Sequence, residues 1–258
     1  MLEKAIESVF AQSYTDWELI IIDDASTDET EERMKKLAIS DKSVNYMRIP
    51  KIVGKGISEY LNIGLRNSKG EYIARIDDDD YWCHKHKLKM QVDFLDNNPE
   101  YVVVGGGVIL VDENGEELFK YLKKETDEEI RNFALFSNPF THATVMFRKS
   151  VAMKLGGYKS LKHVEDMELW LRMGKVGKLY NFKEYFITYM TAGQNKSFQQ
   201  QRENSRTVVD VVKMHKNDYP NFYKAFILNY TQYLYSYLPM FFKKHLQSFM
   251  YYLKRKNF

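Results

Sequence analysis

Apolar residues in the first hundred positions follow two periods, one typical of helices and one typical of buried strands. Leu2, Ile6 and Val9 recur at helical spacing, so a helix is predicted over residues 2–11. Residues 17–23 form a nearly continuous apolar run, which is expected of a strand covered on both faces. The chain therefore opens with a predicted helix and a buried strand.

The alternation of strands and helices continues downstream. Strands are predicted over residues 44–49 and 72–76, and helices over residues 58–67 and 84–97. A further helix is expected to start at Ser26, with Glu29 three residues later completing a capping box. This order of elements predicts an α/β fold with a mostly parallel sheet and flanking helices.

The C-terminal segment differs in composition from the rest of the chain. Residues 215–258 contain 14 Phe or Tyr and seven Lys or Arg against one acid, Asp218. Five aromatic residues recur at helical spacing, namely Phe222, Phe226, Tyr230, Tyr233 and Tyr237. We predict a helical extension over residues 196–258, with a second helix after Pro239. We expect such an aromatic stripe to pack in the core or to form an oligomer contact. Contact with an anionic membrane surface is the second interpretation.

Charge and cysteine content narrow the class of protein. The 258 residues include 38 basic and 35 acidic side chains for a net charge of +3, which excludes a histone-like nucleic-acid binder. A single cysteine, Cys83, excludes a disulfide framework and fits a reducing compartment. No secretory leader pattern and no membrane-spanning apolar stretch are evident. We therefore expect a cytoplasmic protein.

Four consecutive aspartates, Asp77 to Asp80, follow the predicted strand over residues 72–76. Alternate side chains of an extended backbone share a face, so Asp77 and Asp79 are expected to converge on one point. Clustered carboxylates repel one another unless a cation lies between them, and Mg²⁺ or Mn²⁺ prefers such oxygen ligands. A divalent-cation site is predicted here. A solvated acidic turn is the alternative.

A second strand also ends in carboxylates, Asp23 and Asp24. The carboxyl ends of strands in open α/β sheets are where ligands bind, so the two acidic strand ends are expected to share one crevice. Asp24 is interpreted as a ligand-binding residue. Ser26 is interpreted as a helix cap.

Four segments of the chain resemble family 2 glycosyltransferases, in the order found in that family. They are the strand and turn at residues 20–28, the run into the aspartates at residues 70–80, the segment at residues 138–148, and the Gly-Gly-Tyr and Glu-Asp segment at residues 156–172. The resemblance covers residues 1–195. It implies a GT-A-like, Rossmann-type domain, with a nucleotide-binding part over residues 1–98 and an acceptor part over residues 99–195.

The resemblance implies an inverting sugar transfer from a nucleotide-diphosphate donor, with Mn²⁺ or Mg²⁺ as cofactor. By this resemblance Asp24 contacts the base of a UDP-sugar, and Asp77 contacts the ribose or the metal together with Asp79. The resemblance also implies that Asp78 binds the nucleotide-sugar donor. Lys55 is a further candidate for the base or the diphosphate, although an exposed loop lysine is an equal alternative.

The Glu-Asp segment implies the acceptor side of the reaction. Asp166 is expected to act as general base on the acceptor hydroxyl, and Glu165 to bind or orient the acceptor. Trp170 shares a helical face with Asp166 and is predicted to form an aromatic platform for a sugar ring. His142 is expected to line the acceptor cleft, with a core histidine as the alternative. The implied acceptor is a saccharide or a lipid-linked molecule used in cell-surface polysaccharide synthesis.

One departure from the family pattern concerns the sheet. Family members begin with a strand that lies between the strand ending at Asp24 and the strand ending at Asp77, and no such strand precedes Leu2 here. Either the sequence begins downstream of the natural start, which is the favoured explanation, or another segment fills the gap. As it stands, the chain is expected to have a gap here and to bind the donor weakly. Two other functions stay open from the residues: a metal-dependent nucleotidyltransferase, and a non-catalytic carbohydrate-binding or membrane-adaptor protein.

Overall fold

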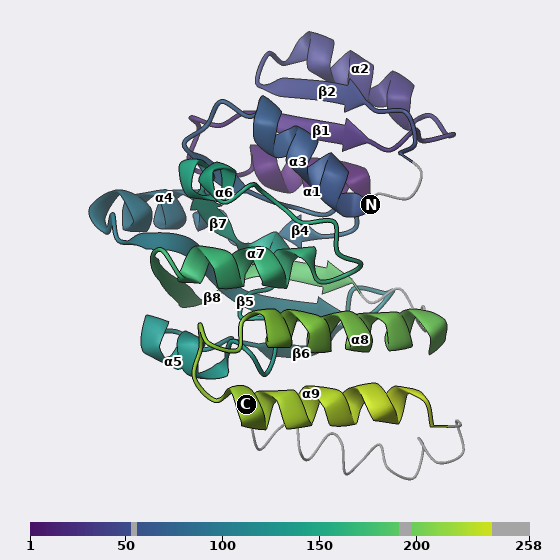
Figure 1. Cartoon of the computed structure of the whole chain (residues 1–258). Helices are drawn as coiled ribbons and strands as arrows, with labels where there is room; N and C mark the ends of the chain where they lie inside the picture. Colours follow the sequence, from purple (N-terminus) through teal and green to yellow (C-terminus); the bar gives the residue numbers. More distant parts are fainter. Residues whose placement is uncertain (53–55, 191–197, 239–258) are drawn as a thin grey trace.

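The computed structural model describes residues 1–52, 56–190 and 198–238 (Figure 1). The first part alternates helices and strands: α1 (Leu2–Phe10), β1 (Leu19–Asp23), α2 (Thr30–Ser40), β2 (Val44–Arg48), α3 (Ile57–Asn67), β3 (Tyr72–Ala74), β4 (Tyr81–Trp82) and α4 (Lys87–Asn97). The second part comprises β5 (Tyr101–Val111), β6 (Glu117–Tyr121), α5 (Asp127–Phe133), the 3₁₀ turn His142–Thr144, β7 (Met146–Arg148), α6 (Lys149–Lys154), α7 (Glu165–Gly174), β8 (Lys178–Met190), α8 (Phe198–Met214) and α9 (Phe222–Ser236). The α/β class and the helical C-terminal segment are confirmed.

The strands of the described residues form a six-stranded sheet and a separate two-stranded sheet. The larger sheet runs in the order β3-β7-β5-β8-β4, with β6 paired to β5, and the smaller contains β1 and β2. Pairs β1–β2 and β5–β8 are parallel, and the other pairs are antiparallel. The sheet is thus mixed, where a mostly parallel one was expected. Short connections are one reason for the antiparallel pairs. Only residues 112–116 join β5 to β6, and so short a connection permits only antiparallel pairing.

The two sheets are divided at the position where the sequence predicts a gap. In the described parts of the chain β1 pairs only with β2, and β3 pairs only with β7. The carboxylate of Glu18 bridges the division, because it accepts hydrogen bonds from the backbone N–H groups of Lys69 and Gly70. One edge of β1 and one edge of β3 therefore have no strand partner among these residues.

Helix α3 connects the small sheet to the loop that precedes α7. The Asn62 side chain accepts a hydrogen bond from the Tyr158 N–H and donates one to the Tyr158 carbonyl, both at 2.8 Å. Gly157 has a φ of +68°, and a Cβ at this position would lie 2.3 Å from Asn62 Oδ1. Glycine is therefore required for this close approach.

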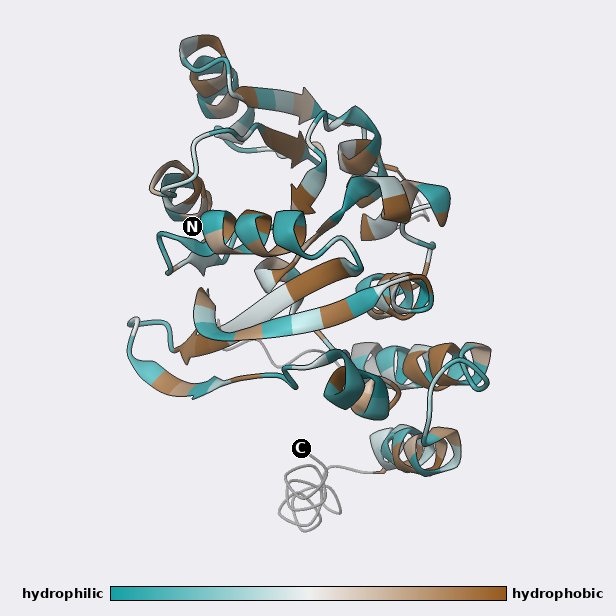
Figure 2. Cartoon of the chain, turned by 90° about the vertical axis from the view of Figure 1, so that its left-hand side faces the viewer, coloured by the Kyte–Doolittle hydropathy of each residue, from teal (hydrophilic) through white to brown (hydrophobic). Residues whose placement is uncertain are grey.

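Helix α7 lies between the larger sheet and the C-terminal helices, and every residue of it except Arg172 is buried (Figure 1). Leu169 and Trp170 belong to a core cluster with residues of β5, β7 and β8. Met167 and Leu171 belong to a second cluster with residues of α8 and α9. Figure 2 shows the corresponding pattern, with apolar residues concentrated in the strands and polar residues on the outer faces of the helices.

The expected helix start at Ser26 is wrong. Helix α2 begins at Thr30 and has no side-chain cap, so Glu29 does not complete a capping box. The Ser26 N–H instead donates a 2.7 Å hydrogen bond to the Asp23 carboxylate. The turn after β1 is thus stabilised by Asp23, and this displaces the helix start by one turn.

The C-terminal helices α8 and α9 lie side by side (Figure 1). Phe222 and Phe226 pack against the cluster that includes α7, as predicted for core packing. An adjacent face of α9 and its C-cap expose a row of apolar side chains, namely Tyr223, Ile227, Tyr230, Leu234 and Tyr237. Tyr230 and Tyr237 of the predicted stripe are therefore exposed rather than in the core. The helix predicted after Pro239 lies outside the described residues. Among the helices that are described, none is long and apolar enough to cross a membrane.

A buried ion pair holds the loop of residues 155–157 against α7. The Glu168 carboxylate, which is 0% exposed, pairs with Arg172 and with Lys159. Arg172 also donates hydrogen bonds to the carbonyl groups of Leu155 and Gly157, at 2.7 and 2.6 Å. Burial alone would raise the pKa of Glu168, but Arg172 and Lys159 outweigh it and lower that pKa.

We predict that Arg172→Leu lowers the free energy of unfolding by about 3 kcal/mol, because it leaves a buried carboxylate with one partner fewer. Denaturant titration at pH 7 measures this loss. Because the pKa of Glu168 is lowered in the folded state, its contribution is present above its unfolded pKa, about 4.3, and the difference between variant and wild type should shrink as the pH falls below it. Lys35→Leu, which removes an exposed ion pair with Glu31, is the control, with an expected loss below about 1 kcal/mol. Equal losses in the two variants would contradict the role of the buried pair.

Candidate functional site

The four aspartates occupy the turn between β3 and β4, at one end of the larger sheet. Asp78 and Asp79 are exposed, and Asp80 is buried with a side-chain oxygen that has no partner in the described residues. The carboxyl groups repel one another. Burial first, and then the charges of Asp77 and Asp79, raise the pKa of Asp80 to about 8. Burial, Asp77 and Asp78 likewise raise the pKa of Asp79.

Arg75, at the end of the strand, is the residue that sequence reasoning missed. Its guanidinium donates two hydrogen bonds to the two carboxylate oxygens of Asp77, and its side chain is only 14% exposed. Burial alone would lower the pKa of Arg75, but the charges of Asp77 and Asp166 help to raise it. A lone cation directly before an acidic cluster is the sequence signal that could have identified it.

Arg75 brings the strand end and the first turn of α7 into one site. It is near enough to Asp166 to lower the pKa of that carboxyl group, and Asp77 in turn acts on Glu165. The charge of Arg75 therefore reaches both acidic segments, while its hydrogen bonds among the described residues go to Asp77.

Asp166 is held firmly within this site. Its Oδ2 accepts a 2.7 Å hydrogen bond from the Asn138 side-chain amide, and its Oδ1 accepts one of 2.7 Å from the Met167 N–H. Burial raises the pKa of Asp166, while these hydrogen bonds and Arg75 offset part of the shift. A raised pKa makes a carboxylate a stronger base, provided that it is still ionised at the working pH.

Glu165 differs from Asp166 in having an oxygen without a partner. It is 7% exposed, and no hydrogen bond reaches its Oε2 from the described residues. Burial raises the pKa of Glu165, and the charges of Asp166 and Asp77 add to the shift. A hydroxyl group of a substrate would satisfy this acceptor.

His142 lies at the first position of the 3₁₀ turn, and its Nε2 is 3.0 Å from the Tyr158 hydroxyl. Burial lowers the pKa of His142 well below its usual value, and Arg75 lowers it further, so the imidazole is neutral. A neutral imidazole is suited to hydrogen bonding, and its predicted place in the acceptor cleft stays a prediction.

The expected role of Trp170 as an exposed sugar platform is wrong. Its side chain is 0% exposed and packs edge-on against Phe147 and Phe140, with ring centroids 5.3 and 6.1 Å apart. Trp170 faces the larger sheet, where residues of β5, β7 and β8 cover it, so its face of α7 is a core face. The Trp170 ring also packs edge-on against the His142 ring, with ring centroids 5.7 Å apart.

The two carboxylates after β1 have different surroundings. Asp23 is buried and accepts hydrogen bonds from Ser26 and from the Tyr46 hydroxyl, so it stabilises the turn. Asp24 is exposed and accepts a hydrogen bond from the Tyr60 hydroxyl, which itself accepts one from the Ile52 N–H. Asp24 is thus the carboxylate that a ligand can reach. Lys55 lies outside the described residues.

The aspartate turn carries carboxylates of the kind that bind divalent cations. In the described part of the chain no three metal-ligating side chains gather in one place. Magnesium-type ions need only one or two carboxylates, with water and substrate phosphates as the other ligands. Asp79 is exposed, whereas both carboxylate oxygens of Asp77 accept hydrogen bonds from Arg75.

Sequence comparison identifies relatives over most of the chain. The model of the family described as Glycosyl transferase family 2 matches residues 1–156. The chain is 37% identical over 187 residues to the putative glycosyltransferase EpsE of Bacillus subtilis, covering 71% of this chain and 66% of the relative. It is 36% identical over 169 residues to the O-antigen biosynthesis glycosyltransferase WbnJ of Escherichia coli, covering 66% of this chain and 65% of the relative. The chain thus spans just under two thirds of the length of these relatives.

Solved structures agree in fold. S. aureus TarS in complex with UDP superposes with a TM-score of 0.61 at 19% identity, over 82% of this chain and 61% of that chain. The mannosyltransferase PcManGT from Pyrobaculum calidifontis, in complex with GDP-Man and Mn²⁺, superposes with a TM-score of 0.62 at 16% identity, over 88% of this chain and 64% of that chain. The fold is the expected GT-A type. With the family model matching more than half of its residues, the chain belongs to glycosyl transferase family 2.

Proposed function

We propose that the chain transfers a sugar, with inversion, from a nucleotide-diphosphate donor to an acceptor hydroxyl group. The observations that support the proposal are the pairing of Arg75 with Asp77 at the aspartate turn and the buried Asp166, whose pKa the charge of Arg75 also lowers. The aspartates on the exposed turn suit the donor half of the reaction. Asp166, which is buried and held by hydrogen bonds, suits the acceptor half.

On the donor side, Asp24 would contact the base and Asp78 would belong to the same site, together with Lys55. Asp79 and Asp77 would hold Mn²⁺ or Mg²⁺, which supplies charge neutralisation for the departing diphosphate. A UDP-sugar is the proposed donor. TarS with UDP and PcManGT with GDP-Man and Mn²⁺ support the donor class and the metal.

On the acceptor side, Asp166 would accept the proton of the attacking hydroxyl group. The acceptor oxygen then bonds to the anomeric carbon on the face opposite the diphosphate, and the bond from that carbon to the diphosphate breaks. Glu165 would accept a hydrogen bond from a second hydroxyl, and His142 would line the same cleft. The relatives' names, which include O-antigen and amylovoran biosynthesis, support a cell-surface polysaccharide acceptor.

Membrane contact is a further part of the proposal. The exposed apolar row on α9 and the basic composition of residues 215–258 suit an anionic lipid surface, where lipid-linked acceptors lie. The proposed location is therefore peripheral, on the cytoplasmic side of the membrane.

We predict that Asp79→Ala lowers Mn²⁺-dependent hydrolysis of a nucleotide sugar by about 100-fold, because the charge of the departing diphosphate is no longer neutralised. A panel of UDP- and GDP-sugars, assayed for sugar release with Mn²⁺ or EDTA, measures this loss. Asp93→Ala, which removes an exposed carboxylate on α4, is the matched control. Hydrolysis that resists both EDTA and Asp79→Ala would contradict the metal role.

For the base, Asp166→Asn should lower transfer by about 100- to 10,000-fold while donor affinity changes little. The asparagine retains the size of the side chain and loses the proton acceptor. In the wild type the rate should fall as the pH drops through the raised pKa of Asp166, at a higher pH than for an ordinary carboxyl group. Transfer rates and donor binding by calorimetry test both points. Loss of donor binding in Asp166→Asn would mean that this residue has another role.

The membrane proposal predicts that the full chain sediments with vesicles containing anionic phosphatidylglycerol and much less with neutral phosphatidylcholine vesicles. Ile227→Glu on the exposed row of α9 should abolish sedimentation, whereas Ile39→Glu on the exposed surface of α2 should not. If size-exclusion chromatography instead shows an oligomer that Ile227→Glu dissociates, the apolar row is a protein interface and the membrane role is rejected.

A further inference from the structure

Three aromatic side chains gather on the larger sheet and are largely exposed. Phe119 on β6 is 54% exposed, Tyr189 on β8 is 37% exposed, and Tyr121 on β6 is half-buried. Phe119 and Tyr189 are both register partners of Leu110 on the intervening strand β5, so the two side chains belong to one row across the sheet. The ring centroids of Phe119 and Tyr121 are 6.1 Å apart. Phe119, Tyr121 and Tyr189 are called the aromatic patch below.

The aromatic patch adjoins the aspartate turn. In the antiparallel pair of β4 with β8, Tyr81 lies opposite Thr188. Continued by one residue, this register places Asp80 opposite Tyr189. Burial first, and then the charge of Asp80, raise the pKa of Tyr189, which agrees with this placement. The row that begins at Phe119 on the edge of the sheet therefore leads through Tyr189 to the turn proposed to bind the metal.

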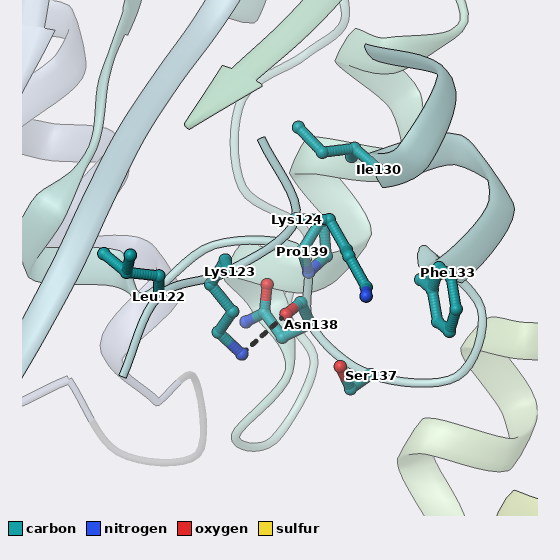
Figure 3. Close-up of a pocket in the computed structure, with 8 residues that line it drawn as sticks. All are labelled: Leu122, Lys123, Lys124, Ile130, Phe133, Ser137, Asn138 and Pro139. Carbon is teal, nitrogen blue, oxygen red and sulfur yellow. Dashed lines mark hydrogen bonds between the residues drawn. The ribbon is translucent and has the colours of Figure 1, made fainter. Parts of the chain in front are cut away.

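The aromatic patch also adjoins the loop on the acceptor side. The Tyr121 hydroxyl oxygen is 3.3 Å from Oγ1 of Thr141, the residue before His142. Two residues after Tyr121, Lys123 donates a 3.1 Å hydrogen bond to the carbonyl group of Asn138 (Figure 3). The side chain of Asn138 in turn holds the carboxylate proposed as base. The patch is thus in contact with both halves of the proposed site.

The fold leaves part of this patch without a partner. In the part of the chain that the structure describes, Phe119 has a ring contact with Tyr121 alone, and the Tyr189 hydroxyl has no hydrogen-bond partner. Isolated exposed apolar side chains are common on protein surfaces. A contiguous exposed patch, in contrast, marks a place where a protein binds a partner or a ligand.

The chemistry and the span of the patch fit a chain of sugars. An aromatic ring packs against the apolar C–H face of a pyranose, and a tyrosine adds a hydroxyl group that hydrogen-bonds the sugar. Phe119 and Tyr189 are two strands apart, which corresponds to about 10 Å. One sugar ring does not cover both side chains, whereas two consecutive sugars do. A nucleotide-sugar donor carries a single sugar, so the span favours the acceptor.

We propose that the aromatic patch binds the saccharide chain of the acceptor by stacking, beside the sugar that carries the reacting hydroxyl group. The inference rests on the proposed transferase function and specifies its acceptor as a saccharide of at least two sugars. Phe119 and Tyr189 thus take the role of sugar platform, for which Trp170 is too deeply buried. Binding away from the reacting atoms orients the hydroxyl group for transfer.

The test is an NMR titration of the full chain with ¹³C-labelled Phe and Tyr rings, in EDTA and without donor. Cellotriose and chitotriose are the probes, because their sugars present flat apolar faces. Glucose supplies one such ring, and open-chain sorbitol supplies hydroxyl groups without a ring. The trisaccharides should bind about tenfold more tightly than glucose and shift the Phe119 and Tyr189 signals, and sorbitol should not bind.

Variants decide whether the patch carries the binding. Phe119→Ala and Tyr189→Ala should each weaken trisaccharide binding by about tenfold, since each removes one stacking ring. Phe119→Trp should keep the affinity within about twofold, because an aromatic face is retained. Tyr223→Ala, which removes an exposed ring on α9, is the matched control and should have no effect. Circular dichroism verifies that each variant is folded.

Three results of the titration would overturn the proposal: no binding of either trisaccharide, binding unchanged in both alanine variants, or glucose binding as tightly as the trisaccharides. An oligomer that Phe119→Ala dissociates in size-exclusion chromatography would also overturn it, because the patch would then be a protein interface. The titration contains neither donor nor metal. A failure of the proposed transferase function therefore appears in the sugar-release assay, while a failure of this inference appears only here.

Discussion

The arrangement of the site depends on the charge of one buried guanidinium group. A cation as inaccessible as Arg75 is stable only when anions surround it, and Asp77 and Asp166 supply the negative charge. Asp77 pairs with Arg75 directly, and the charge of Arg75 extends to Asp166 in the first turn of α7. Burial at this point also raises the pKa of Asp166 and of Glu165. A raised pKa makes each carboxylate a stronger proton acceptor.

The rest of the fold keeps α7 in the position that this charge pairing needs. The sheet packs against one face of the helix and the C-terminal helices cover the other. Glu168 and Arg172 fasten the preceding loop to the helix, and Asn62 fastens the same loop to α3. Through Asn62 the small sheet, whose β1 ends beside Asp24, is connected to the part of the molecule that carries Asp166. These hydrogen bonds therefore link the part of the fold around the two-stranded sheet to the part around the six-stranded sheet.

Two local predictions failed because tertiary contacts outweighed them. Ser26 and Glu29 match a capping box, but the Ser26 N–H is taken by Asp23, which the smaller sheet holds in place through Tyr46. Trp170 does lie on the same face as Asp166, as its spacing predicted. Helical spacing cannot show whether a face is exposed, and here Trp170 is covered by Phe140, Phe147 and Tyr158, which precede α7 in the chain.

From the sequence alone, the order of strands and helices, the two acidic strand ends, the gap between β1 and β3 and the family resemblance could be predicted. Each depends on neighbouring residues or on a pattern along the chain. Only the tertiary structure decided that Arg75 pairs with Asp77, that Asn138 holds Asp166, and that four of the described strand pairs are antiparallel. Most of these features join residues far apart in sequence, and their free energies come from burial and charge pairing that exist only once the chain is folded.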